Sequence, residues 1–164
     1  RGVREWAVPG TKGLEHRVGG LEKDVVTGNI SYEPENHEKM VKLRQQKIDN
    51  IADYIPGLEC SLPQGDVLVL GWGSTYGAIK VAVDALQKEG LQVGQAHLRH
   101  LNPLPKNLGE IISKFKTVLI PELNNGQLIQ IIRAKFLVDD KGLNKRKGQP
   151  LYAEEIKIAV KEML

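Results

Sequence analysis

The sequence has 164 residues, 41% of them hydrophobic and 26% charged, so it is long enough for one domain with its own core and too short for most complete catalytic machines. Its 23 basic and 20 acidic side chains leave a net charge of only +3, which does not argue for nucleic acid as a partner. No apolar run approaches the roughly 18 residues that span a bilayer. Composition therefore predicts a soluble globular domain whose partner is neither a membrane nor a nucleic acid.

Cys60 is the only cysteine, which excludes an internal disulfide and a four-thiolate cluster made by this chain alone. A single thiol is typical of a protein in a reducing cytoplasm. The first thirty residues lack the apolar stretch of a secretion signal, and the sequence starts at Arg1. We therefore expect a cytoplasmic chain that is part of a longer one.

Residues 1–35 are rich in glycine and show no sustained period, which is typical of an extended arm. From about residue 36 to 55, apolar side chains recur at helical spacing and predict a helix of about five turns. Prolines and glycines between 56 and 65 then break the chain before a dense apolar run begins. The first part of the chain thus reads as an arm, a helix and a linker.

From Asp66 onward, short apolar runs alternate with helical segments. In chain order we expect a strand at 67–72, a helix at 75–89, a strand at 91–98, a helix at 106–115, a strand at 117–120, a helix at 126–136, a strand at 143–145 and a helix at 153–164. Pro121 is expected to end the third strand. This recurrence is typical of βαβ crossovers in a parallel sheet, so the predicted fold class is α/β with three layers, α/β/α.

In open parallel sheets, ligands bind at the loops that follow the carboxyl ends of the strands. These loops are Gly73–Gly77, Arg99–Pro105 and Glu122–Gly126. The first precedes a helix, where backbone N–H groups and the helix dipole favour a phosphate or a carboxylate. It fits neither a Walker motif nor GxGxxG, and its glycines serve equally well for a tight turn with Ser74 or Thr75 as the helix cap.

Two other polar groups are candidate sites. If residues 97–99 are extended, His97 and Arg99 share one face and His100 lies on the other, so the two histidines cannot jointly hold a metal ion. Packing and interface hydrogen bonds are the alternative role for all three. Glu15 and His16 are adjacent in the arm and suit acid/base chemistry, although such a pair is also common by chance.

Four segments, spread over most of the chain, resemble the alpha subunit of 2-oxoacid:ferredoxin oxidoreductases, most closely the 2-oxoglutarate type. They are GLEH at 13–16, LGWGSTYG at 70–77, HLRHLNPLPKN at 97–107 and VLIPELNNGQL at 118–128. The arm departs from the family pattern after His16, at Arg17, Val18, Gly19 and Gly20. That departure leaves the role of Glu15 and His16 open.

The resemblance implies that residues 61–164 are a domain similar to the C-terminal domain of transketolase. Residues 1–60 would be the connecting arm and helix that follow an absent thiamine pyrimidine-binding domain. The family oxidatively decarboxylates a 2-oxoacid on thiamine diphosphate, passes the electrons through iron-sulfur clusters to ferredoxin, and forms an acyl-CoA. For the 2-oxoglutarate type the product is succinyl-CoA.

In this interpretation, the chain is a noncatalytic domain that is inactive alone and supplies contacts to a beta subunit and to the remaining domains. It contains no GDG motif for magnesium and diphosphate, so thiamine diphosphate, Mg and the iron-sulfur cluster are expected elsewhere in the full enzyme. The residues expected to contact coenzyme A or another anion are Gly73, Ser74, Thr75, Arg99, Asn124 and Asn125. The alternatives are a stand-alone anion- or nucleotide-binding module and an interaction domain of another transketolase-like complex.

Overall fold

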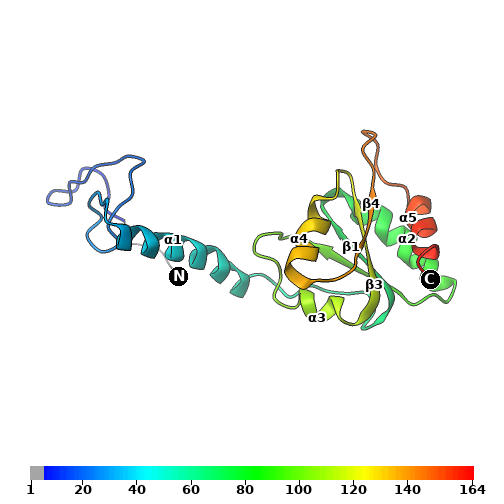
Figure 1. Ribbon diagram of the computed structural model, residues 1–164. Coiled ribbons are helices and arrows are strands. Elements are labelled where there is room, and N and C mark those ends of the chain that lie inside the picture. The colour runs from blue at the N-terminus through cyan, green and yellow to red at the C-terminus, as the bar shows by residue number, and fades with distance from the viewer. Residues whose placement is uncertain (1–5) are drawn as a thin grey trace. The chain divides into compact units, whose positions relative to one another are not determined.

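The computed structural model describes residues 6–164 (Figure 1). The chain forms two compact units, and the boundary in the sequence lies between Tyr54 and Ile55. In the first unit, a glycine-rich arm precedes helix α1 (Pro34–Asp49), and a 3-10 turn follows at Asn50–Asp53. No residue of α1 is buried. The expected arm and helix are therefore present, but the apolar stripe of the helix has no core to pack against within its own unit.

Glu22 holds the end of the arm against α1. Its carboxylate accepts hydrogen bonds from Arg44 at 3.2 Å and lies 3.0 Å from the Nδ1 atom of His37. A short antiparallel bridge between Lys23 and Ile30 closes the loop that leads into the helix. Polar contacts, rather than the burial of apolar side chains, therefore hold the arm against α1 in this unit.

The second unit contains a four-stranded sheet whose neighbouring strands are all parallel, in the order β2-β1-β3-β4. Its strands are β1 (Gly65–Trp72), β2 (Val93–Leu98), β3 (Phe115–Glu122) and β4 (Lys141–Asn144). Its helices are α2 (Tyr76–Lys88), α3 (Leu108–Ile112), α4 (Gln127–Phe136) and α5 (Ala153–Lys161). The predicted alternation of strands and helices is confirmed.

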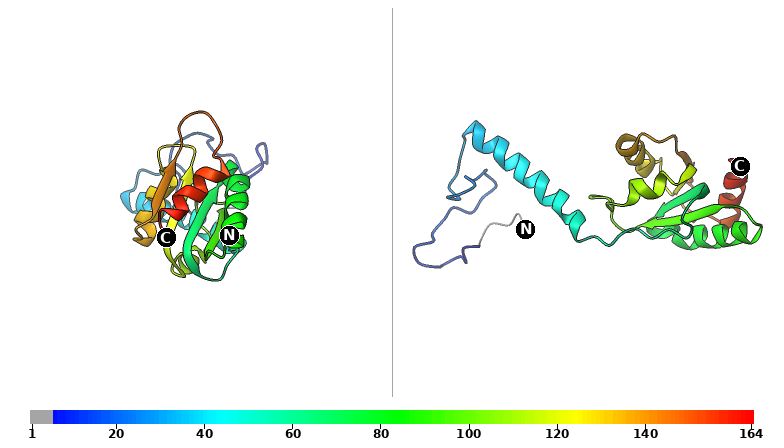
Figure 2. Two further views of the ribbon diagram at one scale, coloured as in Figure 1. Left: turned by 90° about the vertical axis from the view of Figure 1, so that its right-hand side faces the viewer. Right: turned by 90° about the horizontal axis from the view of Figure 1, so that it is seen from below.

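Helices cover both faces of this sheet, which confirms the three-layer α/β architecture (Figures 1 and 2). One core lies under α2 and α5 and contains Val67 and Val69 of β1 together with Ile156. The other lies under α3 and α4 and contains Leu68 and Leu70 of the same strand. Because successive side chains of a strand point to opposite faces, a strand buried on both sides needs the continuous apolar run that the sequence shows.

The third strand runs two residues further than expected, because it includes Pro121 and Glu122. The pairing of β1 with β3 ends at Val69 and Leu119, whereas β3 continues to pair with β4 as far as Glu122. Glu122 directs its carbonyl oxygen toward β4, where it accepts a hydrogen bond from Lys145. By alternation, the ring nitrogen of Pro121 faces the side on which β1 has already separated, so its missing N–H interrupts no ladder.

None of the helices in residues 6–164 is both long enough and apolar enough to cross a membrane.

Candidate functional site

The carboxyl ends of β1 and β3 separate at the point where the strand order reverses, which is where open α/β sheets bind ligands. Beyond Val69 and Leu119 the two strands no longer pair with each other: β1 continues beside β2 to Trp72 and β3 beside β4 to Glu122, and each then enters its own loop. Between the two ends, the indole Nε1 of Trp72 donates a hydrogen bond of 3.3 Å to the carboxylate of Glu122. A side-chain contact therefore replaces the backbone ladder here.

Glu122 is fully buried, and its carboxylate occupies the N-terminal end of α4. It accepts hydrogen bonds from the backbone N–H groups of Leu128 at 2.9 Å and Ile129 at 3.2 Å, and from the side-chain amide of Asn124 at 3.2 Å. These are the donors that an external anion would otherwise use. The chain thus fills this helix N-terminus with its own carboxylate.

The sequence analysis did not single out Glu122, although a signal was present. An acidic residue at the carboxyl end of a buried strand and five residues before a helix is well placed to reach that helix's first N–H groups. From the sequence alone, Glu122 is expected only as the start of the loop Glu122–Gly126.

Asn124 and Asn125 hold the loop between β3 and α4. The side-chain oxygen of Asn124 accepts hydrogen bonds from the N–H groups of Gly126 at 2.7 Å and Gln127 at 3.1 Å. Asn125 accepts one from Arg146 at 2.9 Å. Both side chains therefore make contacts within the domain.

The loop after β1 forms a tight turn. Gly73 has a positive φ of 59°, a conformation that side chains other than glycine rarely adopt. Thr75 is buried, and its hydroxyl donates a hydrogen bond of 2.8 Å to the carbonyl of Trp72, while Ser74 is exposed. This is the turn-and-packing role that the sequence analysis set beside anion binding.

Gly73 and Arg99 are brought together. Both line a cavity of about 540 Å³ that also involves Trp72, Tyr76 and His97. Neither Asn124 nor Asn125 lies in it, so the six residues do not form one cluster.

A second cavity of about 480 Å³ lies at the β2 edge of the sheet and is lined by the segment 56–61, α2 and the end of β2. His97, Arg99 and His100 all line it. The expectation that His97 and His100 lie on opposite faces assumed that residues 97–99 are extended, whereas β2 ends at Leu98 and the chain bends at Arg99. Even so, the described residues contain no group of three or more His, Cys, Asp and Glu side chains that could hold a metal ion.

His97 is partly buried in this region. Its ring packs edge-on against Tyr76, with 5.1 Å between the ring centroids, and its Nδ1 atom is buried without a hydrogen-bond partner. Burial lowers the pKa of His97 below its ordinary value, which favours the neutral imidazole at neutral pH. A neutral His97 accommodates the nearby Arg99 without charge repulsion.

Glu15 and His16 lie in the first unit and form separate contacts. A carboxylate oxygen of Glu15 accepts a hydrogen bond from the N–H of Gly13 at 3.1 Å. Backbone hydrogen bonds, from Glu15 itself and then from Gly13, lower the pKa of Glu15. The Nδ1 atom of His16 contacts the carbonyl oxygen of Leu14 at 2.8 Å. Each side chain is thus engaged with neighbouring backbone.

Residues 65–161 match the family model for pyruvate:ferredoxin oxidoreductase core domain II. The chain is 52% identical to the 2-oxoglutarate oxidoreductase subunit KorA of Mycobacterium tuberculosis, over 94% of this chain and 24% of that protein. It is 33% identical to the alpha subunit of 2-oxoacid:ferredoxin oxidoreductase 2 of Aeropyrum pernix, over 90% of this chain and 24% of that protein. The chain spans about a quarter of the length of these curated relatives.

Two solved structures resemble the model. A 2-oxoglutarate:ferredoxin oxidoreductase from Magnetococcus marinus, with 2-oxoglutarate, coenzyme A and succinyl-CoA bound, superposes with a TM-score of 0.90 and 32% identity over 99% of this chain and 29% of that one. An inactive split-gene transketolase superposes with a TM-score of 0.52 and 16% identity over 65% of this chain and 41% of that one, which shows the shared fold alone. Both the motif resemblance and the transketolase-like fold are thereby confirmed. The chain belongs to the 2-oxoacid:ferredoxin oxidoreductase family, and its residues 65–161 correspond to core domain II.

Proposed function

We propose that this chain is the core domain II of an alpha subunit in a 2-oxoglutarate:ferredoxin oxidoreductase. The complete enzyme would convert 2-oxoglutarate and coenzyme A to succinyl-CoA and CO2, with transfer of two electrons to ferredoxin. The observation that carries this proposal is the 52% identity to KorA over 94% of the chain. The Magnetococcus marinus enzyme, whose structure has the same domain, supports the same substrate.

The described residues offer no ligand set for the metal ions of that reaction. Residues 6–164 provide no cluster of three or more ligands for a metal ion, and Cys60 is the only cysteine in the sequence. In our proposal, thiamine diphosphate, magnesium and the iron-sulfur cluster are held by other domains or by a beta subunit. This domain would contribute subunit contacts and be inactive alone in the cytoplasm.

Of the six candidate contacts to coenzyme A or another anion, Gly73, Ser74 and Arg99 are open to a ligand, since Ser74 and Arg99 are exposed and Gly73 lines a cavity with Arg99. Thr75 and Asn124 already make hydrogen bonds within their own loops, and Asn125 accepts one from Arg146, which follows β4. We propose that the first three face the coenzyme and that the other three fix the loops beside it.

The test of this function uses the full-length alpha subunit assembled with its beta subunit. We expect reduction of ferredoxin that depends on both 2-oxoglutarate and coenzyme A, formation of succinyl-CoA, and loss of all activity when residues 55–164 are deleted. Pyruvate in place of 2-oxoglutarate is the matched control substrate. Faster turnover of pyruvate, or activity of the 164-residue chain by itself, would contradict the proposal.

A further inference from the structure

Asn125 and Gly126, in the loop between β3 and α4, form the only Asn-Gly pair in the sequence. Asparagine is chemically labile, because the backbone nitrogen of the next residue can attack its side-chain carbonyl carbon. The reaction is easiest when glycine follows, since glycine has no Cβ to shield that nitrogen and its backbone turns freely. By its sequence, this pair is therefore the position at which the chain is most prone to modify itself.

The reaction consumes water and releases ammonia. Hydroxide removes the proton of the Gly126 N–H, the nitrogen forms a bond to the Cγ atom of Asn125, and the side-chain nitrogen takes a proton from water and leaves as ammonia. Water then opens the cyclic succinimide at either of its carbonyl groups. One opening gives aspartate, and the other gives isoaspartate, in which the backbone is longer by a carbon atom. In both products a neutral amide has become a carboxylate.

The folded loop withholds the nucleophile. The Gly126 N–H donates a hydrogen bond of 2.7 Å to the side-chain oxygen of Asn124, which also accepts one from the Gln127 N–H at 3.1 Å. Removal of the proton would leave a nitrogen anion facing the lone pairs of this oxygen, so the contact makes deprotonation of Gly126 harder. Gly126 is also buried, which limits the access of hydroxide to its N–H.

Packing restrains both reacting groups. Gly126 has a positive φ of 86°, and a Cβ built on it would lie 3.0 Å from the side chain of Asn144 and 3.0 Å from that of Ile129. The side chain of Asn125 is exposed, but its oxygen accepts a hydrogen bond of 2.9 Å from Arg146, in the loop after β4. Formation of the ring therefore disturbs a closely packed backbone and an anchored side chain.

We propose that Asn125 is a latent deamidation site, and that Asn124 keeps it unreacted while the loop between β3 and α4 is folded. Opening of the loop frees the Gly126 nitrogen and starts the reaction. The aspartate product retains Arg146 as a partner, whereas isoaspartate lengthens the backbone inside the turn that Asn124 closes. This inference concerns the chemistry of one loop and does not depend on the activity proposed above.

Peptide mapping by mass spectrometry, after incubation of the chain in mildly alkaline buffer, tests the proposal. It measures the conversion of Asn125 to aspartate and isoaspartate. We expect conversion in the folded chain to be slower by about tenfold or more than in the same chain unfolded in guanidinium chloride at the same pH. Hydrogen exchange of the Gly126 N–H in the folded chain should be slowed by about the same factor or more.

Variants separate the role of Asn124 from the effect of folding in general. Asn124→Ala should speed conversion in the folded chain about tenfold, because it removes the acceptor of the Gly126 N–H. Asn107→Ala is the matched control: it removes another asparagine that holds a loop, through Leu58, and should leave the rate at Asn125 unchanged. Asn125→Gln should abolish the conversion, because the longer side chain would have to close a less favourable ring.

Three results would overturn the proposal. They are conversion in the folded chain as fast as in the unfolded chain, no acceleration by Asn124→Ala, and equal acceleration by Asn124→Ala and Asn107→Ala. If Asn124→Ala does not fold, hydrogen exchange in the unsubstituted chain decides: slow exchange of the Gly126 N–H supports the proposal, and exchange as fast as in the unfolded chain overturns it.

Discussion

Replacing Glu122 by glutamine tests whether its buried carboxylate holds α4 to the end of β3. The two oxygens accept hydrogen bonds from Leu128 at 2.9 Å, Ile129 at 3.2 Å and the Trp72 indole at 3.3 Å, among others. Glutamine keeps one oxygen, but its amide nitrogen would face a backbone N–H, donor against donor. An unpaired buried N–H costs about 1–3 kcal/mol, and the lost negative charge at a helix N-terminus about 0.3–1 kcal/mol. We expect Glu122→Gln to lower the free energy of unfolding by about 1–4 kcal/mol.

Urea unfolding followed by tryptophan fluorescence measures this loss. The sequence has two tryptophans, and a Trp6→Phe background leaves only Trp72, whose indole contacts Glu122 directly. The matched control is Glu154→Gln in the first turn of α5, where the carboxylate is 69% exposed and pairs with Lys157, and where we expect a loss below about 1 kcal/mol. Equal losses for Glu122→Gln and Glu154→Gln would refute the reasoning.

Three further predictions concern stability. A Cβ at Gly71 would overlap the buried side chain of Ile79 in α2, so Gly71→Ala should lower the free energy of unfolding by about 1–3 kcal/mol. A Cβ at Gly77 meets open space within α2, so Gly77→Ala should raise the free energy of unfolding by about 0.5–1 kcal/mol. Equal effects of the two variants in urea unfolding would contradict this reasoning. Burial raises the pKa of Asp140 above its ordinary 3.8, so the folded chain holds that proton more tightly than the unfolded chain does. The free energy of unfolding should therefore fall as pH rises from 3.8 through the folded-state pKa of Asp140. Asparagine does not titrate, so Asp140→Asn should lack this contribution when unfolding is measured on both sides of pH 3.8. Asn107→Ala removes two hydrogen bonds to Leu58 and should speed hydrogen exchange of the Leu58 amide about tenfold, whereas an unchanged rate would show that the segment is held by other contacts.

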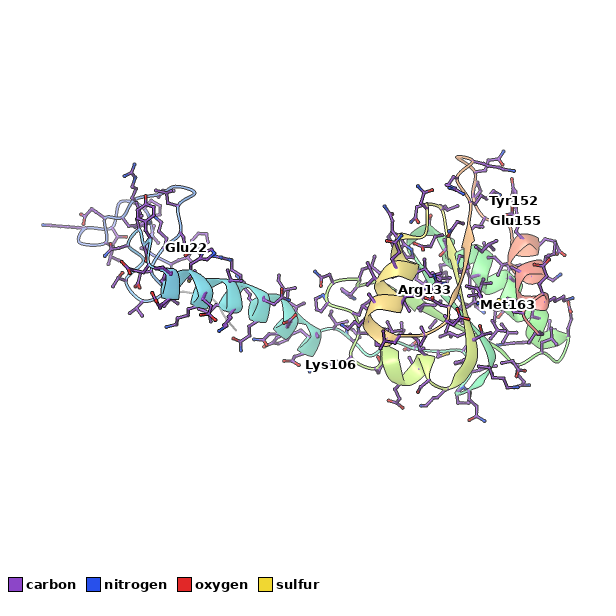
Figure 3. All side chains as sticks on the ribbon, in the orientation of Figure 1. Glu22, Lys106, Arg133, Tyr152, Glu155 and Met163 are labelled. Atoms are coloured by element: carbon purple, nitrogen blue, oxygen red, sulfur yellow. The ribbon has the colours of Figure 1, made fainter. Side chains whose placement is uncertain are left out.

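The arrangement around Asp140 shows why such a site is hard to foresee. Asp140 is fully buried, accepts a hydrogen bond from the Nε of Arg133 at 2.5 Å, and has a second oxygen without a partner. Arg133, labelled in Figure 3, projects from α4, whereas Asp140 directly precedes β4 in the chain. In the sequence the two residues are ordinary charges of a helix end and a loop. Only the packing of β4 against β3 places Asp140 in the interior.

Local contacts, by contrast, were readable from spacing. Lys80 and Asp84 are four residues apart in a predicted helix, and the structure places their charged atoms 2.7 Å apart. Tyr152 and Glu155, labelled at the start of α5 in Figure 3, show the same principle, because the Tyr152 N–H donates to the Glu155 carboxylate at 2.8 Å. Residues one helical turn apart meet whatever the rest of the fold does.

The sequence by itself determined the α/β class, the alternation of elements and the family, because continuous apolar runs, helical periodicity and four ordered motifs are local properties of the chain. It also placed the loops that follow the strands. Only the tertiary structure decided that Pro121 continues a strand, that Glu122 fills the N-terminus of α4, and that Gln95 is buried. Each of these depends on which strand lies beside which, and parallel pairing joins residues that are far apart in the chain.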